Sequence, residues 1–163
     1  GGSGDDEPTV NPPGDDDEDQ PGGGGHQPGG SDIPTTDPGT VPGVTANPSD
    51  LIGSWLVTGG YSAYYVNGSL AEGYPYTPDS GLGATWTLNA DGTYTTSEGE
   101  SGTWWISGTT VYITMSEDGY GSETMPFTLA VFTGSQAELR FDYFENFDGM
   151  NVHSIESISF ERL

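Results

Sequence analysis

Apolar and polar residues alternate from about residue 51 to the end of the chain. Apolar side chains recur at every second position in short runs, and Gly, Asn, Asp and Ser separate the runs. This is the period of a β-strand that buries one face. The pattern predicts eight strands and no helix of ordinary length. The strands are expected at residues 51–58, 84–89, 92–98, 101–107, 109–116, 123–132, 136–144 and 152–163.

The apolar face of every predicted strand needs a shared core. Closing an antiparallel sheet provides one and removes exposed edges. We therefore predict an all-β fold, an eight-stranded antiparallel up-and-down barrel, with a two-sheet sandwich as the alternative and a further strand possible at residues 63–67. The inward positions that follow are Leu51, Gly53, Trp55, Val57, Ala84, Trp86, Leu88, Tyr94, Thr96, Gly102, Trp104, Ile106, Val111, Ile113, Met115, Phe127, Leu129, Val131, Leu139, Phe141, Tyr143, Ile158, Phe160 and Arg162.

Residues 59–83 form the longest predicted connection, and they are rich in tyrosine. Loops of this length in compact domains commonly carry function. The loop is expected to cover one mouth of the barrel, where its tyrosines either close the core or contact a ligand. The inward aromatic side chains could largely fill the interior, which favours a small cavity or none. The candidate ligand-binding residues are Tyr61, Tyr64, Tyr65, Tyr74, Tyr76, Trp86 and Trp105.

The first fifty residues differ in composition from the rest. They contain twelve Gly, nine Pro and eleven Asp or Glu, and all nineteen aromatic residues follow them. Such a segment cannot bury enough apolar surface to offset the entropy of ordering it. Residues 1–48 are therefore predicted to be a disordered acidic linker, and residues 49–163 to be the barrel domain.

The charge of the chain excludes several partners. The formal net charge is −23, with two Arg and no Lys, so the phosphate backbone of a nucleic acid would be repelled. An anionic membrane surface is disfavoured for the same reason. Zero Cys excludes disulfides and thiolate metal sites. No signal peptide or apolar membrane-spanning run is present, and a monomer is expected.

No catalytic or metal-binding constellation emerges from the residues. Residues 87–98 approach a calcium-loop pattern but lack its first ligand, and their flanks are strands. His26 and His153 are isolated, which makes them poor metal ligands. The paired acids fall in turns, where nothing raises the pKa of one partner. The sequence predicts a protein without enzymatic activity, metal or cofactor.

Gly53-Ser54-Trp55 resembles the Gly-x-Trp signature on the first strand of lipocalins. Lipocalins commonly place a basic residue near the chain end across that tryptophan, and Arg162 is at the matching position. The Thr-rich hairpins at residues 86–94 and 102–111 are similar to those in lipocalin-like domains of bacterial secreted lipoproteins. The resemblance covers residues 49–163 and implies a cation–π contact between Arg162 and Trp55. The chain is shorter than a typical lipocalin and lacks the flanking helix.

The residues at 3–7, Ser-Gly-Asp-Asp-Glu, resemble the segment that follows the lipidated cysteine in some outer-membrane lipoproteins. That resemblance implies export to the outer membrane or cell surface, with a lipid anchor that is absent from this chain. The expected function is a binding module holding a small apolar or amphipathic ligand at the barrel mouth. The alternatives are a glycan- or protein-binding surface with a filled barrel, and a structural domain of a cell-envelope assembly.

Overall fold

The computed structural model describes residues 33–117 and 121–163. The predicted disorder of residues 1–32 lies outside the described residues. In residues 33–117 and 121–163, one short helix lies before the first strand and another lies between β3 and β4. No helix in these residues is long and apolar enough to cross a membrane. The elements are α1 (Pro48–Leu51), β2 (Gly53–Val66), β3 (Ser69–Pro75), η1 (Pro78–Ser80), β4 (Thr85–Leu88), β5 (Thr93–Thr96), β6 (Ser101–Ser107), β7 (Thr110–Glu117), β8 (Gly121–Phe132), β9 (Gln136–Phe147) and β10 (Met150–Arg162).

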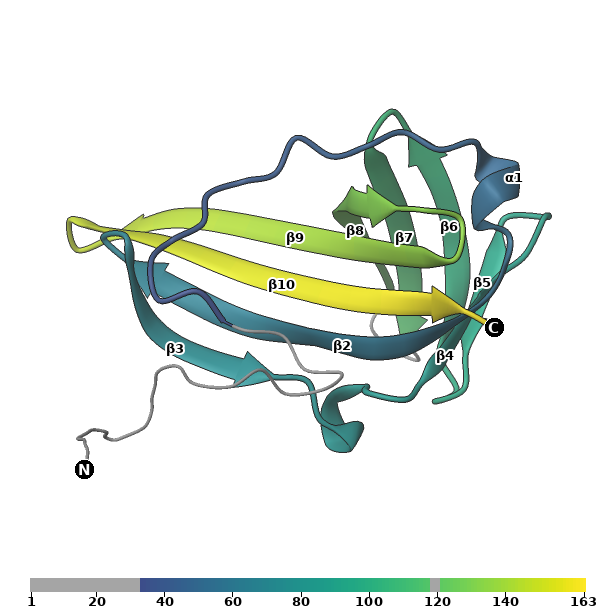
Figure 1. Ribbon diagram of the computed structural model, residues 1–163, viewed down its shortest axis with the longest axis horizontal. Helices are drawn as coiled ribbons and strands as arrows, with labels where there is room; N and C mark the ends of the chain where they lie inside the picture. Colours follow the sequence, from purple (N-terminus) through teal and green to yellow (C-terminus); the bar gives the residue numbers. More distant parts are fainter. Residues whose placement is uncertain (1–32, 118–120) are drawn as a thin grey trace, which may run out of the picture. The chain divides into compact units, whose positions relative to one another are not determined.

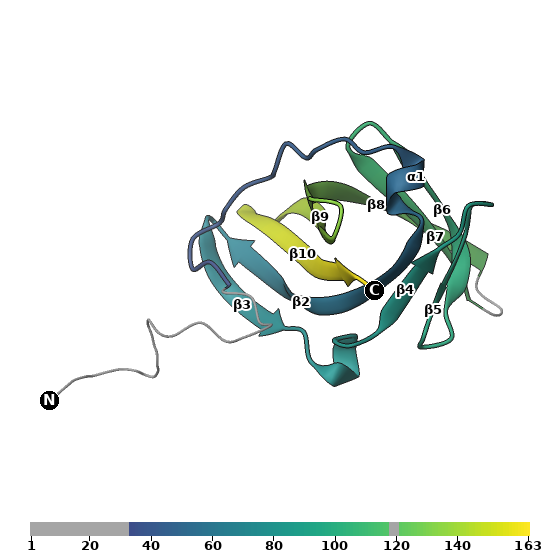
Figure 2. The same ribbon diagram turned by 45° about the vertical axis from the view of Figure 1, so that its right-hand side comes forward.

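The strands form one antiparallel sheet that closes on itself. Neighbouring strands pair in chain order from β4 to β10, β2 pairs with β4, and β10 returns to pair with β2. These eight strands are the predicted barrel, so the fold class is confirmed. β3 is an additional strand on the edge of β2. Figure 1 shows β2, β3, β9 and β10 extending beyond the shorter strands, and Figure 2 shows the strands curving around the barrel interior.

The predicted loop at residues 59–83 is mostly a β-hairpin, so this prediction was wrong. β2 continues for 14 residues to Val66 and turns through Asn67 and Gly68 into β3. Both turn residues have positive φ, at 50° and 89°, as a tight hairpin requires. The first part of β2 pairs with β4 and the last part with β3, while its other edge pairs with β10. Only residues 76–84 remain as a connection.

A β-bulge in β2 changes which side chains face the barrel interior. Phe160 pairs with Val57, but the preceding Ser159 pairs with Gly59, so Thr58 is an extra residue. Before the bulge Trp55 and Val57 face inward. After it, the parity of β2 is reversed, as expected for one inserted residue. We call the face of the sheet away from the barrel interior the outer face.

The reversed parity divides the tyrosines of β2 between the two faces. Tyr61 and Tyr65 pair with Ser157 and His153 of β10 and lie on the outer face. Tyr64 and its neighbour Ser62 share the face of the barrel interior. A loop conformation would not have imposed this division.

A second bulge in β8 corrects one predicted core residue. Leu129 pairs with Leu139, but Val131 pairs with Glu138, which leaves Ala130 without a partner. Val131 is therefore exposed rather than inward. Phe132 takes the inward position, where its ring lies 6.3 Å from that of Trp55. Tyr143, also predicted to face inward, is 52% exposed, because this part of β9 extends beyond its pairing with β8.

The described residues form two separate hydrophobic cores. The larger one fills the barrel, as the inward aromatic positions predicted, and includes Trp55, Tyr94, Trp104, Phe127 and Phe160. The smaller one lies on the outer face of β2 and β10. Its members are Tyr61, Ala63, Tyr65 and Ile155, with Ile33 and Leu70 packed against them.

Residues 33–47, which we call the strap, cover the outer face on their way to α1. The strap pairs with β3 at an isolated bridge from Thr36 to Ser69, and farther along Val44 donates to the Leu129 carbonyl at 2.8 Å. Figure 1 shows it crossing β10 and β9 near one end and then continuing above them toward α1. The described compact unit begins at Ile33, so the predicted domain boundary at residues 48/49 falls inside it.

Gly60 permits the close approach of β2 and β10 at the bulge. Its φ is 137°, and a Cβ there would lie 2.2 Å from the Ser157 carbonyl oxygen. We predict that Gly60→Ala lowers the free energy of unfolding by about 3 kcal/mol, because both the backbone conformation and the packing oppose it.

Gly68→Ala is the matched control for this prediction. Gly68 also has positive φ but no atom within 4 Å of its added Cβ, so its expected cost is about 1 kcal/mol. Urea unfolding followed by tryptophan fluorescence measures both variants. Equal losses of unfolding free energy in the two variants would show that the contact with Ser157 is unimportant.

Candidate functional site

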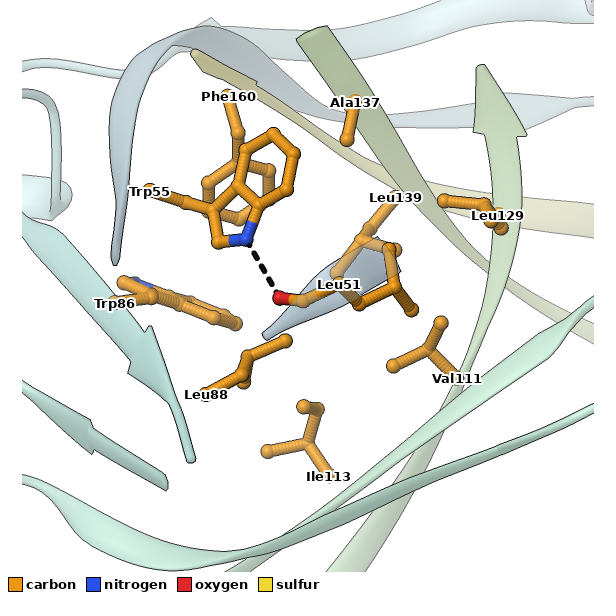
Figure 3. A pocket seen from close by; sticks show the side chains of 10 residues that line it. All are labelled: Leu51, Trp55, Trp86, Leu88, Val111, Ile113, Leu129, Ala137, Leu139 and Phe160. Carbon is orange, nitrogen blue, oxygen red and sulfur yellow. Dashed lines mark hydrogen bonds between the residues drawn. The ribbon is translucent and has the colours of Figure 1, made fainter. Parts of the chain in front are cut away.

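The barrel interior holds only a small cavity. Its volume is about 30 Å³, and apolar side chains line it. Figure 3 shows these side chains, with the Trp55 indole donating to the Leu51 carbonyl at 2.9 Å. Pockets that hold drug-sized molecules measure roughly 300 Å³ or more. Trp86, predicted as a ligand contact, lines this cavity with its ring 5.1 Å from that of Phe160.

Arg162 closes one end of the barrel. Its guanidinium lies 4.2 Å from the Trp55 ring centroid, so the predicted cation–π contact is present. The same group donates to the carbonyls of Asp50, Ile52 and Gly134. A Cβ at position 53 would lie 2.8 Å from Arg162 Nη1. This close approach explains why glycine occupies the position two residues before Trp55. Arg162 therefore joins β10 to the segment entering β2.

The other end of the barrel has an open groove, which we call the mouth groove. It has a volume of about 280 Å³. Its lining side chains come from β2, β3, β9 and β10, where these strands extend beyond the barrel. The lining residues are Ser62, Ala63, Tyr64, Tyr74, Phe141, Ser154, Ile155 and Glu156.

Strand pairing explains why these residues meet. Glu156 has the parity of Ile158 and Phe160, which face the interior, and it pairs with Ser62 of β2. Ser62 also pairs with Tyr74 of β3. Directly opposite residues share a face of an antiparallel sheet. The mouth groove is therefore the continuation of the inner face beyond the barrel.

Two tyrosine hydroxyls bind carboxylates at the mouth groove. The Tyr76 hydroxyl donates to Glu156 Oε2, and the Tyr74 hydroxyl donates to Glu72 Oε1. Burial and then the Glu156 carboxylate raise the pKa of Tyr76. The hydrogen bond to Glu72 raises the pKa of Tyr74. Both phenols are therefore neutral donors at ordinary pH, and they hold the carboxylates in place.

Two of the five predicted tyrosines line the mouth groove, and one supports it. Tyr64 and Tyr74 line it and are 36% and 59% exposed. Tyr76 supports it by donating a hydrogen bond to Glu156, one of the lining residues. Tyr61 and Tyr65 are instead buried in the smaller core on the outer face. The Tyr65 hydroxyl donates to the Pro34 carbonyl at 2.8 Å, and burial raises its pKa to about 12.

Trp105 lies far from the mouth groove in the fold. It is 46% exposed on the outer face of β6, where its ring stacks on Tyr112 at 4.9 Å. Sequence reasoning missed Ser62, Ser154 and Glu156 as site residues. A usable signal existed for Glu156, because it has the same parity as Ile158 and Phe160 in the last predicted strand. An acid in an inward position is uncommon unless it is paired or functional.

A buried polar network fixes the strap to the outer face. His153 is 4% exposed, and its two ring nitrogens contact carboxylates, Nδ1 with Asp37 at 2.8 Å and Nε2 with Asp142 at 2.6 Å. The imidazole ring is thus held between a carboxylate of the strap and a carboxylate of β9. Arg140 Nη2 lies 3.4 Å from Asp142 and donates to the Gly39 carbonyl. His153, predicted as an isolated residue, is thus a structural link between the strap, β9 and β10.

Asp37, Asp142 and His153 do not form a metal site. Both carboxylates contact the ring nitrogens, so no common point remains for an ion. Within the described part of the chain no group of three His, Cys, Asp or Glu has a geometry that could hold a metal.

The geometry defines a closed antiparallel barrel with a filled interior and an open, tyrosine-lined groove on its extended flank. No family model, curated protein or solved structure matches the chain.

Loss of the Asp37 charge should loosen the strap. Burial opposes the Asp37 charge, but the Gly39 amide, His153 and Arg140 outweigh it and lower the pKa of this carboxyl. Its stabilising effect is therefore complete above the ordinary value of 3.8 and is lost as the pH falls through the lowered pKa. We expect Asp37→Asn to accelerate hydrogen exchange of strap amides on the order of tenfold. This factor corresponds to the free energy that one charge-assisted hydrogen bond contributes.

Exchange measured by mass spectrometry at pH 7, corrected for intrinsic rates, tests this effect. Asp79→Asn removes the same charge at an exposed position in η1 and serves as the control. Wild-type strap amides should also lose protection as the pH is lowered below 3.8. Unchanged protection of the strap in Asp37→Asn would contradict the role assigned to the network.

Removal of the Arg162 guanidinium should destabilise the whole barrel. Arg162→Met keeps an unbranched side chain but loses the cation–π contact and leaves three carbonyls without their donor. We expect the free energy of unfolding to fall by about 2 to 4 kcal/mol. The neighbouring Glu161→Gln should change it by less than about 0.5 kcal/mol, because Glu161 is exposed. Similar urea midpoints for the two variants would rule out this role of Arg162.

Proposed function

We propose that this protein is a non-enzymatic binding module that holds a small amphipathic ligand in the mouth groove. The difference between the interior cavity and the mouth groove carries the proposal. The interior has room for about 30 Å³, whereas the mouth groove offers about 280 Å³ and is open to solvent. A ligand would therefore lie in the groove at the barrel mouth and would not be enclosed by the barrel.

The lining of the mouth groove suits a ligand with both apolar and polar parts. Phe141, Tyr64 and Tyr74 provide ring surfaces. Ser62, Ser154 and Glu156 provide hydrogen-bonding groups among them. Sites for small molecules commonly combine apolar and aromatic walls with a few polar groups that fix orientation. The hydroxyls of Tyr74 and Tyr76 already hold carboxylates, which favours a preformed site.

The lipocalin-like character and the cellular location belong to the same proposal. The contact of Arg162 with Trp55 supports a lipocalin-like origin of the barrel. The acidic segment at residues 3–7 supports export as a lipid-anchored surface protein. A module displayed in this way would meet ligands from the medium, which accords with an open groove.

A neutral glycan bound on the outer face of β6, β7 and β8 is the second candidate. The stacked rings of Trp105 and Tyr112 lie at its centre, and stacked aromatic rings offer apolar contact surface. Strand pairing places no charged side chain among the flanking outward residues, although the chain is strongly acidic. These residues are Thr103, Ser107, Thr110, Thr114, Thr124, Pro126 and Thr128.

A fragment screen monitored by amide NMR spectra separates the two candidates. We expect small ring-containing amphipathic fragments to shift the signals of Ser62, Tyr64, Ser154 and Glu156. Ser154→Trp should abolish these shifts by filling the mouth groove, and Ser122→Trp, on an exposed position of β8, should not. Tyr74→Ala, which removes an exposed ring, provides a second test if Ser154→Trp unfolds. Shifts confined to Trp105 and Tyr112 would favour the glycan surface, and no shifts at either place would refute both.

A further inference from the structure

The mouth groove combines aromatic rings with negative charge and lacks any basic group. Three of its lining residues are aromatic and one is Glu156, while none of the eight is basic. Rings carry a negative potential on their faces, so they attract cations as well as apolar groups. The groove therefore favours a positive charge on its ligand.

The carboxylate of Glu156 is available at one oxygen. Its Oε2 accepts the Tyr76 hydroxyl, and among the described residues no hydrogen bond reaches Oε1. Half-burial of Glu156 reduces screening by water and strengthens its interaction with a ligand charge. Glu72 adds a second carboxylate at the rim, held by the Tyr74 hydroxyl.

The two arginines of the chain lie outside the mouth groove and already bind other groups of the protein. Arg140 lies on the outer face, where it contacts Gly39 and Asp142, and Arg162 lies at the opposite end of the barrel. The chain has no lysine, and its formal charge is −23. An anionic ligand would find no partner in the mouth groove, whereas a cation would be attracted by the field of the whole protein.

We propose that the mouth groove binds an organic ammonium ion, a quaternary or protonated amine with apolar substituents. Its charge lies against Glu156, and its alkyl groups contact the rings of Tyr64, Tyr74 and Phe141. This inference rests on the proposed function and specifies the class of ligand. Arrangements of aromatic rings around a cation are a recurrent means of recognising such groups.

Choline and its neutral isostere 3,3-dimethylbutan-1-ol test the ammonium charge at constant shape. Both are titrated into the full chain at fixed ionic strength, with NMR shifts of mouth-groove amides as the readout. We expect choline to bind about tenfold more tightly than the isostere, since cation–π and carboxylate contacts are available only to choline. Tyr74→Ala should weaken choline binding about threefold, and Tyr74→Phe should largely retain it.

Glu156→Gln and Glu161→Gln separate a specific contact from general attraction. Both remove one charge from β10, but Glu161 lies on the outer face at the far end. We expect Glu156→Gln to weaken choline binding at least about fivefold, and Glu161→Gln to leave choline binding nearly unchanged. Equal effects of the two variants would overturn the proposal.

The outcomes distinguish this inference from the proposed function. If the isostere binds in the mouth groove as tightly as choline, the ammonium preference is wrong and the binding module stands. If choline causes no shifts there while other fragments do, the ammonium class is again wrong. If no small molecule shifts the mouth-groove amides, the proposed function itself fails.

Discussion

The close passage of the Gly60 backbone over the Ser157 carbonyl determines the arrangement of everything beyond the barrel. A side chain at this position could not fit, since its Cβ would be 2.2 Å from the oxygen. The bulge beside it reverses the parity of β2. Tyr61 and Tyr65 can then anchor the strap on the outer face, while Tyr64 contributes to the mouth groove. One inserted residue thus gives a single strand two different buried faces.

Each of the two arginines joins strands to a segment that is not a strand. Arg162 binds carbonyls in and after α1 and in the turn before β9, and Arg140 binds the Gly39 carbonyl in the strap. A guanidinium has five donors in a fixed plane, so it can satisfy several carbonyls at once. With both arginines engaged in this way, the rest of the surface is left acidic or neutral, and the mouth groove shares that character.

The closed barrel could be predicted because each short strand has a clear two-residue period and one apolar face, as in Val111, Ile113 and Met115. The contact of Arg162 with Trp55 followed from a resemblance in the first and last strands of the barrel. The possible strand at residues 63–67 anticipated only part of the hairpin of β2 and β3. The rest was missed because both faces of the hairpin are partly buried, so Tyr61, Tyr64 and Tyr65 show no simple alternation. Bulges at Thr58 and Ala130 shift parity without a local signal. The strap was missed because its residues are mostly Pro, Gly, Thr and Val, a composition that predicts disorder when its long-range partners are unknown.

The route of the strap has a mechanical consequence. A pulling force applied on the N-terminal side of Ile33 would first load the contacts of Ile33, Thr35 and Asp37, which can detach one after another. The closed ladder between β2 and β10 would carry the load only after residues 33–47 had peeled away. The strap would then add extensible length, which would lower the peak force on the barrel and delay its rupture.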